Sequence, residues 1–426
     1  MRSEEAEQHP IRANGRVLAA SMVGSTIEYY DFFIYATAAA LVFGPLFFPQ
    51  QSPSAQTMLS LLTFGVAFVA RPVGAVLFGH FGDRVGRKAT LVAALLTMGF
   101  STVAIAFLPT YATAGWIAPA LLCLLRFGQG LGLGGEWGGA ALLAVENAPP
   151  GWRARFGAVP QMGAPLGLIF ANGLFLALSL TLSKDDFAAW GWRLPFLLSA
   201  VLVGVGLWVR LRIGETPAFV AAAKLESPPH IPVARLFAEH ADAVVYGTAG
   251  VVATFAAFYL FTAFALAQAT SQLGYPREQF LGLQLLSDVF YAIGITLGAI
   301  RADRTSPAAT IGGGAIGLVF IGLIFGPGLS FVGIAMAGAT LSLAMLVLGF
   351  GNAALAAWLA QLFPVRLRYS GMSLAFNVGG IIGGAITPLV AQALSSAGHT
   401  GLTGLLLSLG AVITVFGTRL GRAKHN

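Results

Sequence analysis

The chain has 426 residues, of which 57% are hydrophobic and only 10% are charged. Soluble globular proteins carry about 25% charged residues, so the composition excludes an ordinary soluble fold and leaves no room for a sizeable soluble domain. The net charge of +7 does not indicate a nucleic-acid partner, because the basic residues lie in short loops between apolar segments. The only cysteine, Cys123, lies within an apolar segment, which excludes an intramolecular disulfide bond and a cysteine metal cluster.

Apolar segments long enough to cross a membrane core of about 30 Å follow one another along the whole chain. They lie at residues 17–43, 57–79, 89–109, 115–147, 157–181, 190–210, 243–270, 280–300, 308–328, 331–361, 370–395 and 401–418. We therefore expect an all-α integral membrane protein with twelve transmembrane helices. Their glycine and alanine content suits close helix packing in lipid.

The longest connection between spans divides the chain into two halves. We expect residues 1–210 and 243–426 to form two pseudo-symmetric six-helix bundles, joined by a cytoplasmic loop at 211–242. The halves resemble each other weakly, because the Asp-Arg pair at 83–84 after the second span corresponds to the Asp-Arg pair at 303–304 after the eighth. Related six-helix halves are typical of transporters, whose substrate site lies between the halves near the membrane midplane.

The basic residues predict how these spans are oriented. If the N-terminus is cytoplasmic, 19 of the 24 lysines and arginines fall in cytoplasmic segments. Only Lys184, Arg193 and Arg277 fall in outer loops. Arg71 and Arg126 remain inside spans. This asymmetry satisfies the positive-inside rule, so we expect a multi-pass protein of the bacterial cytoplasmic membrane with both termini in the cytoplasm.

A ten-residue polar loop, GHFGDRVGRK at residues 79–88, joins the second and third spans. Its glycines allow a tight turn, and its aspartate can cap the next helix or pair with an arginine. An ordinary basic inner loop is the alternative interpretation. The whole pattern resembles the signature loop of the major facilitator superfamily, which implies alternating access by two six-helix bundles. The resemblance assigns a cytoplasmic latch to Gly79, Asp83, Arg84, Gly86, Arg87 and Lys88.

Five further sequence runs indicate a particular family within this superfamily. They are IEYYDFFIYATAAALVFGPLFFP, RPVGAVLFGHFGDRVGRK, RFGQGLGLGGEWGGAALLAVENAPP, WGWRLPFLLS with GETPAF, and FPVRLRYSGMSLAFNVGG. These runs resemble the metabolite:proton symporter family, which implies uptake of a small organic acid or zwitterion driven by the proton gradient, with no cofactor. Two features depart from the family pattern. The second-half loop GAIRADRTSP lacks the Gly-Arg-Lys ending, and Asp288 places a carboxylate inside the eighth span without an assigned role.

Five charged residues interrupt the first, second and fourth spans: Glu28, Asp31, Arg71, Arg126 and Glu136. A charge at that depth costs at least a few kcal/mol, which makes each one a candidate functional residue. No histidine lies inside a span, so a proton carrier has to be a carboxyl group, whose protonation responds to burial and to a nearby arginine. We expect Asp31 and Arg126 to form the proton-coupling pair, with Glu28 and Glu136 as further candidates. A permanent structural ion pair is the alternative.

Arg71 lies near the membrane midplane, and its planar fork matches a carboxylate, so we assign it to substrate recognition. A fixed Arg71–Glu136 ion pair is the rival interpretation. Gln161 resembles the glutamine with which many sugar porters of the superfamily contact substrate, and an interhelical hydrogen bond is its alternative. The other candidates for the substrate cavity are Tyr35, Tyr259, Asn377 and Asp288.

The cytoplasmic half of the fourth span carries two more features. Glu146 together with Arg153 or Arg155 is interpreted as a latch at the cytoplasmic end. The glycine-rich run GQGLGLGGEWGG at residues 128–139 has some likeness to a nucleotide-binding loop. Inside a long apolar helix, however, it predicts close contact between helices.

These observations together predict a monomeric secondary active transporter and not an enzyme. We expect alternating access to move a small organic anion with protons, the anion being a dicarboxylate, a shikimate-like acid or an aromatic carboxylate. The expected partners are this anion, H⁺ and the lipid bilayer. Proton-coupled uptake of a zwitterion such as proline or betaine, and an uncoupled facilitator, are the alternatives. An intramembrane enzyme or a sensor is disfavoured, because the spans hold no histidine and no cluster of metal ligands.

Overall fold

The computed structural model describes residues 10–85, 87–212, 232–330, 333–365 and 367–423, and every regular element in these ranges is a helix. The helices are α1 (Pro10–Ala13), α2 (Gly15–Ala38), η2 (Ala39–Phe43), α3 (Gly44–Phe47), α4 (Pro53–Val85), α5 (Arg87–Ile105), α6 (Tyr111–Ala114), α7 (Ile117–Gly134), α8 (Trp137–Glu146), α9 (Arg153–Gln161), α10 (Gly163–Thr181), α11 (Lys184–Ala189), η3 (Gly191–Arg193), α12 (Leu194–Arg212), α14 (Pro232–Tyr259), η4 (Leu260–Phe264), α15 (Ala265–Ser271), α16 (Arg277–Arg304), α17 (Pro307–Ser330), α18 (Gly333–Asn352), α19 (Leu355–Leu362), α20 (Arg368–Gly380), η5 (Ile381–Ile386), α21 (Thr387–Ser396), η6 (Thr400–Leu402) and α22 (Thr403–Ala423). The all-α prediction is therefore confirmed.

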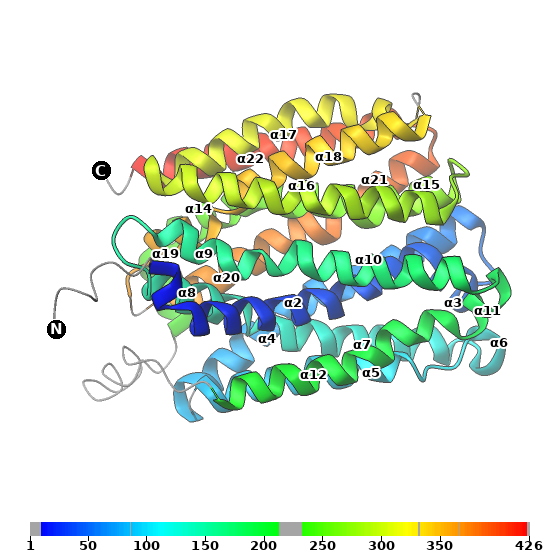
Figure 1. Ribbon diagram of the computed structural model, residues 1–426, viewed down its shortest axis with the longest axis horizontal. Helices are drawn as coiled ribbons and strands as arrows, with labels where there is room; N and C mark the ends of the chain where they lie inside the picture. The colour runs from blue at the N-terminus through cyan, green and yellow to red at the C-terminus, as the bar shows by residue number, and fades with distance from the viewer. Residues whose placement is uncertain (1–9, 86, 213–231, 331–332, 366, 424–426) are drawn as a thin grey trace.

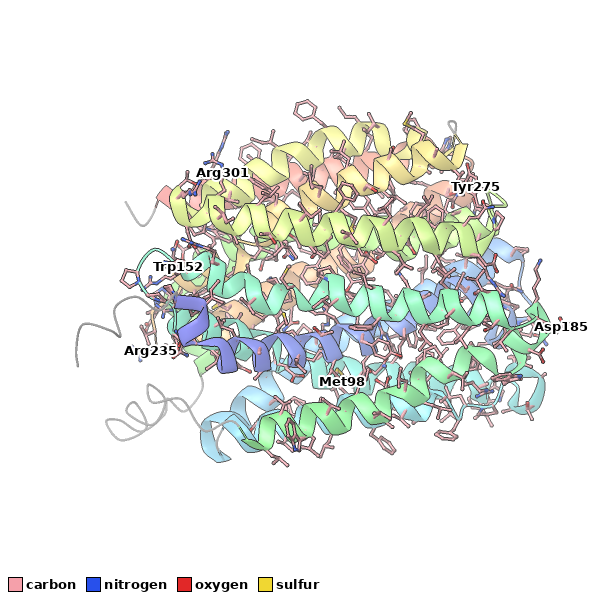
Figure 2. All side chains as sticks on the ribbon, in the orientation of Figure 1. Met98, Trp152, Asp185, Arg235, Tyr275 and Arg301 are labelled. Carbon is pink, nitrogen blue, oxygen red and sulfur yellow. The ribbon has the colours of Figure 1, made fainter. Side chains whose placement is uncertain are left out.

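Among the described residues, eleven helical stretches are long and apolar enough to cross a membrane, and Val92–Ile105 forms a shorter apolar helix. Together they correspond to the twelve expected spans. The long helices run side by side, and α1 and the end of α22 lie at the same end of the bundle (Figure 1). Figure 2 shows Arg235 and Arg301 at that end, and Asp185 and Tyr275 at the opposite end. Polar side chains at both ends and apolar ones between them suit a protein embedded in lipid.

The same packing pattern occurs twice along the chain. In the first half α2 packs on α10, α4 on α7, and α5 on α12. In the second half α14 packs on α20, α16 on α18, and α17 on α22. These are the first and fifth, second and fourth, and third and sixth spans of each half, which is the arrangement expected of two related bundles.

Two kinds of interruption also recur at equivalent places. The first and seventh spans each contain a π-helical turn, η2 and η4, and the eleventh contains η5. The fourth span breaks between α7 and α8, and the tenth breaks between α18 and α19. Such interruptions in membrane helices are tolerated where the backbone is buried in protein or lines a cavity, so these stretches of backbone are expected to face the interior of the protein and not lipid.

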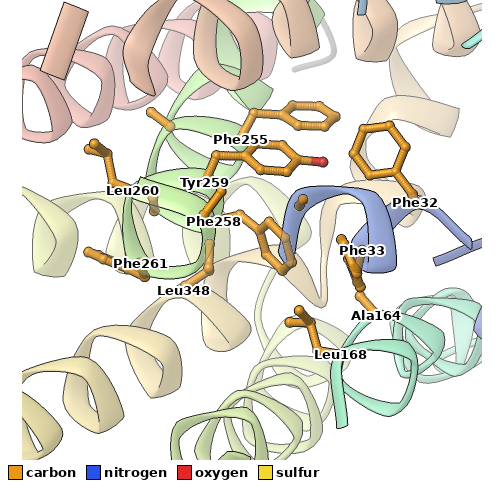
Figure 3. Packing of buried hydrophobic residues seen from close by; sticks show 14 of the residues in the cluster. Phe32, Phe33, Ala164, Leu168, Phe255, Phe258, Tyr259, Leu260, Phe261 and Leu348 are labelled. Atoms are coloured by element: carbon orange, nitrogen blue, oxygen red, sulfur yellow. The ribbon is translucent and has the colours of Figure 1, made fainter. Parts of the chain in front are cut away.

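The two halves meet along α10 with α16 and along α4 with α20, η5 and α21. Aromatic side chains fill the middle of this interface. The rings of Phe33 and Phe258, from α2 and α14, stack with their centroids 5.0 Å apart. Figure 3 shows these two residues facing each other, with Phe32, Phe255 and Tyr259 beside them. The centre between the halves is therefore closely packed in this conformation.

The glycine-rich run of the fourth span brings helices into close contact, as predicted. A Cβ atom added to Gly130 would collide with the carbonyl oxygen of Ala67, and one added to Gly134 would collide with the carbonyl oxygen of Arg71. Only glycine allows the backbones of α7 and α4 to approach this closely. This approach brings the backbone at Arg71 against the fourth span.

The connection between the halves differs from the expected loop at 211–242. Helix α14 begins at Pro232, and its backbone departs from helical geometry at His240, with φ −139° and ψ 30°. The end of the expected loop is therefore a short helical segment that bends into the seventh span. Proline is well tolerated in the first turn of a helix, where its missing N–H is not needed. Residues 213–231 lie outside the described part of the chain.

Candidate functional site

Two buried arginines from neighbouring helices lie against the same aromatic ring. Arg71 of α4 is 4% exposed and Arg126 of α7 is fully buried. The guanidinium carbon of Arg71 is 4.4 Å from the ring centroid of Phe32, and that of Arg126 is 4.2 Å from the same centroid. Phe32 belongs to α2, so the first, second and fourth spans build this group together. Cation–π attraction holds a guanidinium on a ring more strongly when the pair is desolvated.

Further aromatic rings surround the two cations. The guanidinium of Arg126 also lies 4.0 Å from the ring centroid of Tyr35 and 4.7 Å from that of Phe64. Arg71 lies 4.5 Å from the centroid of Phe68. Aromatic faces stabilise a cation but do not neutralise its charge. The group therefore keeps a positive charge in an apolar setting.

Tyr259 brings the second half of the chain into this site. It lies on α14 at the start of the π-helical turn η4. Its ring packs against Phe64 and Phe68, with centroids 5.1 and 5.2 Å away, and its hydroxyl group is close enough to Arg71 to interact with it electrostatically. The predicted substrate candidates Arg71, Tyr35 and Tyr259 thus lie together, and Tyr259 and Arg71 connect the two bundles.

Several donor atoms of the two arginines have no protein partner. Among the described residues, Arg71 Nε and both Nε and Nη2 of Arg126 are buried without a hydrogen bond. The structure describes no ion pair for either guanidinium. Instead, the two cations are close enough to repel each other electrostatically. Buried donors are normally satisfied, so these atoms mark a place where an anionic ligand would find ready partners.

Asp31 and Arg126, the expected proton-coupling pair, lie on either side of Thr102, and neither Asp31 carboxyl oxygen has a hydrogen-bond partner among the described residues. Asp31 is fully buried and lies beside the hydroxyl groups of Thr102 and Ser199. Arg126 Nη1 donates a hydrogen bond to Gln129 Oε1 at 2.8 Å, and Gln129 Nε2 donates to Thr102 Oγ1 at 2.8 Å. Within the described residues the direct ion pair is not formed, and the permanent ion pair held open as the alternative is absent from this conformation.

Gln161 lies at the centre of a second polar network, which crosses between the halves. Its Oε1 accepts from the Tyr29 hydroxyl at 3.4 Å and from Trp137 Nε1 at 3.5 Å. Its Nε2 donates to Asn352 Oδ1 at 3.5 Å, and Asn352 Nδ2 donates to the Tyr291 hydroxyl at 2.6 Å. The interhelical hydrogen bond that was the alternative for Gln161 therefore exists. The long distances show that the amide is held loosely.

A third contact between the halves forms where the fourth span breaks. Asn377 Nδ2 on α20 donates to the carbonyl oxygen of Gly134 at 3.3 Å, and the Tyr369 hydroxyl donates to the carbonyl oxygen of Gly135. The Trp137 and Phe376 rings stack with centroids 3.5 Å apart. In this conformation Asn377 therefore hydrogen-bonds to a carbonyl group at the end of α7 that lacks a partner within its helix. A broken membrane helix requires such partners for its backbone.

Glu28 and Glu136 are both buried, at 5% and 1% exposure. Glu136 occupies the N-cap position of α8, at the break of the fourth span. Negative charge is favoured at a helix N-terminus, where the first N–H groups have no intrahelical partner. The contacts described for Arg71 are with the Phe32 and Phe68 rings, and it interacts electrostatically with Tyr259. The rival Arg71–Glu136 ion pair is therefore not what holds Arg71 here.

Among the described residues, two ion pairs connect the halves at the end of the bundle predicted to be cytoplasmic. Arg155 Nε lies 2.7 Å from Asp303 Oδ2, and this carboxylate also accepts from the backbone N–H of Ala154 and Arg155 at 2.8 and 3.1 Å. Asp303 of the second half thereby caps the N-terminus of α9. The other pair joins Glu146 Oε1 to Arg368 Nη1 at 3.3 Å.

These pairs correct one detail of the predicted latch. Glu146 bonds to Arg368 across the bundle interface, not to Arg153 or Arg155 as expected. The physical reason is that the start of α9 faces α16, where the Asp303 carboxylate is already engaged with Arg155. Arg153 is exposed. The side chains of the expected latch at Gly79, Asp83, Arg84, Gly86, Arg87 and Lys88 lie outside the described residues.

Several residues of the site were not singled out from the sequence. These are Phe32, Gln129, Thr102, Asn352 and Tyr291, which hold the arginines or link the buried polar groups. The sequence could have indicated Gln129 and Asn352, because a polar amide inside a span normally finds a hydrogen-bond partner on another helix. It could not have indicated Phe32, since phenylalanine is common in any membrane span.

Known proteins resemble this chain in both sequence and fold. A family model described as "Sugar (and other) transporter" matches residues 17–228. Over 418 residues the chain is 46% identical to the inner membrane metabolite transport protein YhjE of Escherichia coli strain K12, covering 96% of this chain and 94% of that protein. It is 37% identical over 417 residues to the shikimate transporter of the same strain, covering 94% and 92%.

A solved structure has the same arrangement of helices. The xylose transporter XylE from Escherichia coli, in a partially occluded inward-open conformation, matches with a TM-score of 0.76 over 94% of this chain and 96% of that one. The sequences are 15% identical in this alignment, so the likeness shows the fold and carries no information about the substrate.

Proposed function

The chain belongs to the major facilitator superfamily of multi-pass membrane transporters, and from that premise we propose that it takes up a small organic acid anion together with protons. One observation carries the proposal. Arg71 and Arg126 are buried on a shared phenylalanine ring, and no carboxylate of the described residues pairs with either one. An uncompensated buried cation is costly, and an anionic substrate would offset that cost.

The substrate carboxylate is proposed to bind at Arg71. The free Nε and the planar fork suit a bidentate contact with a carboxylate, and the Tyr259 hydroxyl beside it can orient the bound group. Arg126, with two free donors, lies close enough to attract a second negative charge or a carbonyl oxygen. The rings of Phe32, Phe64 and Phe68 would cover the apolar part of a cyclic or aromatic acid. The similarity to a shikimate transporter supports this class of substrate.

Proton coupling is proposed to act through Asp31. Its buried carboxyl group lies near Thr102, which Gln129 joins to Arg126, so its protonation would change the electrostatic surroundings of the anion site. When Asp31 is protonated, Arg126 is available to the anion. When Asp31 loses its proton after the bundles rock, its negative charge competes for Arg126 and favours release of the anion.

The inner contacts would open in the same movement. Arg155–Asp303 and Glu146–Arg368 join the halves at the predicted cytoplasmic end, so an inward-open state requires both to separate. The Gln161–Asn352 contact also crosses between the halves and is already 3.5 Å long. Rocking of two rigid bundles around a central site is the general way in which such symmetric transporters work.

The purified protein in proteoliposomes, with an imposed inward proton gradient, tests this proposal. Labelled dicarboxylates, shikimate and benzoate-like acids are supplied one at a time, beside proline and betaine. Gradient-driven accumulation of an acid, abolished by a protonophore, supports the proposal. Accumulation of betaine or proline alone would favour the zwitterion alternative. Equilibration without accumulation would favour an uncoupled facilitator.

The zwitterion alternative finds less support in the geometry. A quaternary ammonium group is normally bound on open aromatic faces. Here the faces of Phe32, Tyr35 and Phe64 are already occupied by Arg126, and those of Phe32 and Phe68 by Arg71. A second cation at this place would be repelled by both guanidinium groups.

A further inference from the structure

Asp288 is a buried carboxylic acid that the proposed transport mechanism does not use. It lies near the middle of α16, the eighth span, and its side chain is fully buried. Neither carboxyl oxygen has a hydrogen-bond partner among the described residues. Buried carboxyl groups normally accept several hydrogen bonds, so its state needs an explanation.

The polar side chains nearest along α16 bond elsewhere. Gln284 Nε2 donates to the carbonyl oxygen of Thr262 at 2.9 Å, and the Ser287 hydroxyl donates to the carbonyl oxygen of Gln284 at 2.8 Å. Tyr291, one turn further, interacts electrostatically with Asp288, but its hydroxyl group accepts from Asn352. Asp288 therefore receives no neutral donor from its own helix.

The surrounding helices provide no cation either. Helix α16 packs against α9, α10, α15, α17 and α18. Helices α10, α15, α17 and α18 contain no Asp, Glu, His, Cys, Tyr, Lys or Arg in their described residues. Helix α9 carries Arg153 and Arg155, but Arg155 bonds to Asp303, which is about 22 Å along α16 from Asp288. Among the described residues, the phenols of Tyr29 and Tyr259 interact electrostatically with Tyr291, one turn from Asp288.

An ionised carboxylate without donors or a counter-charge would cost several kcal/mol in such a place. The neutral carboxylic acid avoids most of that cost. We propose that Asp288 is a second proton-binding site, in the C-terminal half, which holds its proton in this conformation and releases it when the bundles rock. The release is a simple dissociation: the O–H bond breaks, the proton passes to water, and the carboxylate remains.

The position of α16 explains how rocking would reach Asp288. This helix packs against α10 of the other half (Figure 1). One turn from Asp288, Tyr291 is bonded to Asn352, which in turn contacts Gln161 across the bundle interface. Separation of the halves at Gln161–Asn352 would change the surroundings of this turn of α16 and admit water. The inference rests on the proposed proton coupling and adds a second proton to each transport cycle.

The ratio of protons to substrate tests the inference. Wild-type protein is reconstituted in proteoliposomes with the membrane potential clamped to zero, and the accumulation of the acid identified above is measured at several pH gradients. Because each coupled proton contributes the full pH difference, two protons predict about 100-fold accumulation per pH unit and one predicts about tenfold. We expect about 100-fold in the wild type, and about tenfold in Asp288→Asn, which resembles the protonated acid in shape.

The measured ratio distinguishes failure of the second proton site from failure of the proposed coupling. A wild-type ratio of one, or a ratio of two that persists in Asp288→Asn, overturns the second site while leaving the proposed function intact. A wild-type ratio of zero overturns the proposed coupling itself. A sodium requirement lost in Asp288→Asn would show a metal cation at this position instead of a proton. Loss of substrate counterflow in a well-folded variant would show that Asp288 contacts the substrate.

A second neutral variant keeps the test valid if Asp288→Asn does not fold. Asp288→Ser is smaller than the acid and is made in parallel, and size-exclusion profiles in detergent establish which variants are folded. Asp288→Glu keeps the acid and is expected to keep the ratio of two. If both neutral variants retain the wild-type ratio, Asp288 carries no transported proton.

Discussion

The two halves of this transporter repeat one packing scheme but bury very different charges. The first half places two arginines on aromatic rings and bonds one of them through Gln129 to Thr102, near the buried Asp31. The second half buries Asp288, whose carboxyl oxygens have no hydrogen-bond partner among the described residues. Related architecture therefore does not imply related chemistry. In the proposed mechanism both cations that bind the anion come from the first half, and the second half contributes Tyr259 and a proton site at Asp288.

The largest expected effect comes from removing the central cation. Arg71→Gln should lower the affinity for the acid at least about 30-fold, because truncating a buried charged partner costs about 2–5 kcal/mol. Arg71→Lys should recover little, since an ammonium group lacks the planar fork. Binding is measured by isothermal titration of the purified protein. The matched control is Arg235→Gln, which removes an exposed arginine paired with Glu239 at the end of the bundle; equal losses in both variants would contradict the assignment.

Removing the Asp31 carboxyl group should weaken the coupling of transport to the proton gradient. Asp31→Asn is expected to lower accumulation from about 100-fold to about tenfold per pH unit while substrate counterflow continues, because the neutral amide cannot carry a proton and only Asp288 still carries one. Uptake with and without an imposed pH gradient measures the effect. Asp185→Asn, an exposed carboxylate at the opposite end from the termini, should behave like the wild type. Accumulation that stays at the wild-type level in Asp31→Asn would show that Asp31 carries no transported proton.

The link between Asp31 and Arg126 should also be measurable. Gln129→Leu removes both hydrogen bonds of the amide, and we expect the coupling between proton and anion binding to weaken by about 1–3 kcal/mol, a 5- to 150-fold change. The experiment compares anion affinity at two pH values in the wild type and in the variant. An unchanged pH dependence would mean that the two groups communicate by another route.

The contact of the fourth span with the second should affect stability more than specificity. Gly134→Ala places a methyl group against the carbonyl oxygen of Arg71, and such overpacking costs about 1–3 kcal/mol. A lower melting temperature in detergent is expected. Gly282→Ala is the control, because a Cβ atom there meets nothing within 4 Å. Equal melting temperatures for the two variants would show that α4 and α7 can separate easily.

The smallest effect is expected at the inner end of the bundle. The Glu146–Arg368 pair is partly exposed, so its loss in Glu146→Gln should change stability by no more than about 1 kcal/mol. Its consequence should instead be a shift toward inward-open molecules, read from cysteine accessibility near Gly157. A double-mutant cycle with Arg368→Gln isolates the pair. If the single and double variants open to different extents, the bond between these two residues is not the contact that matters.

The sequence was sufficient for the architecture. Membrane spans depend on runs of apolar residues of a length set by the bilayer, and positive charges between the spans indicate their orientation. The twelve spans, the major facilitator fold and the close contacts of the glycine-rich run could therefore be predicted. The orientation of the termini, the boundaries of the two halves and the roles of Asp31, Arg71 and Arg126 stay predictions. The same reasoning did not show that helix begins again at Pro232, because its polar, proline-rich surroundings read as a loop.

The five charged residues inside the spans were visible in the sequence by themselves, since each interrupts an apolar run at a cost that function has to explain. Their partners were not visible. Spacing along a helix fixes depth and face, but it does not fix which residue of another helix lies opposite. Only the tertiary structure decided that Arg71 and Arg126 share Phe32, that Gln129 joins Arg126 to Thr102, and that Glu146 bonds to Arg368. It also decided that the Asp288 carboxyl group has no hydrogen-bond partner among the described residues.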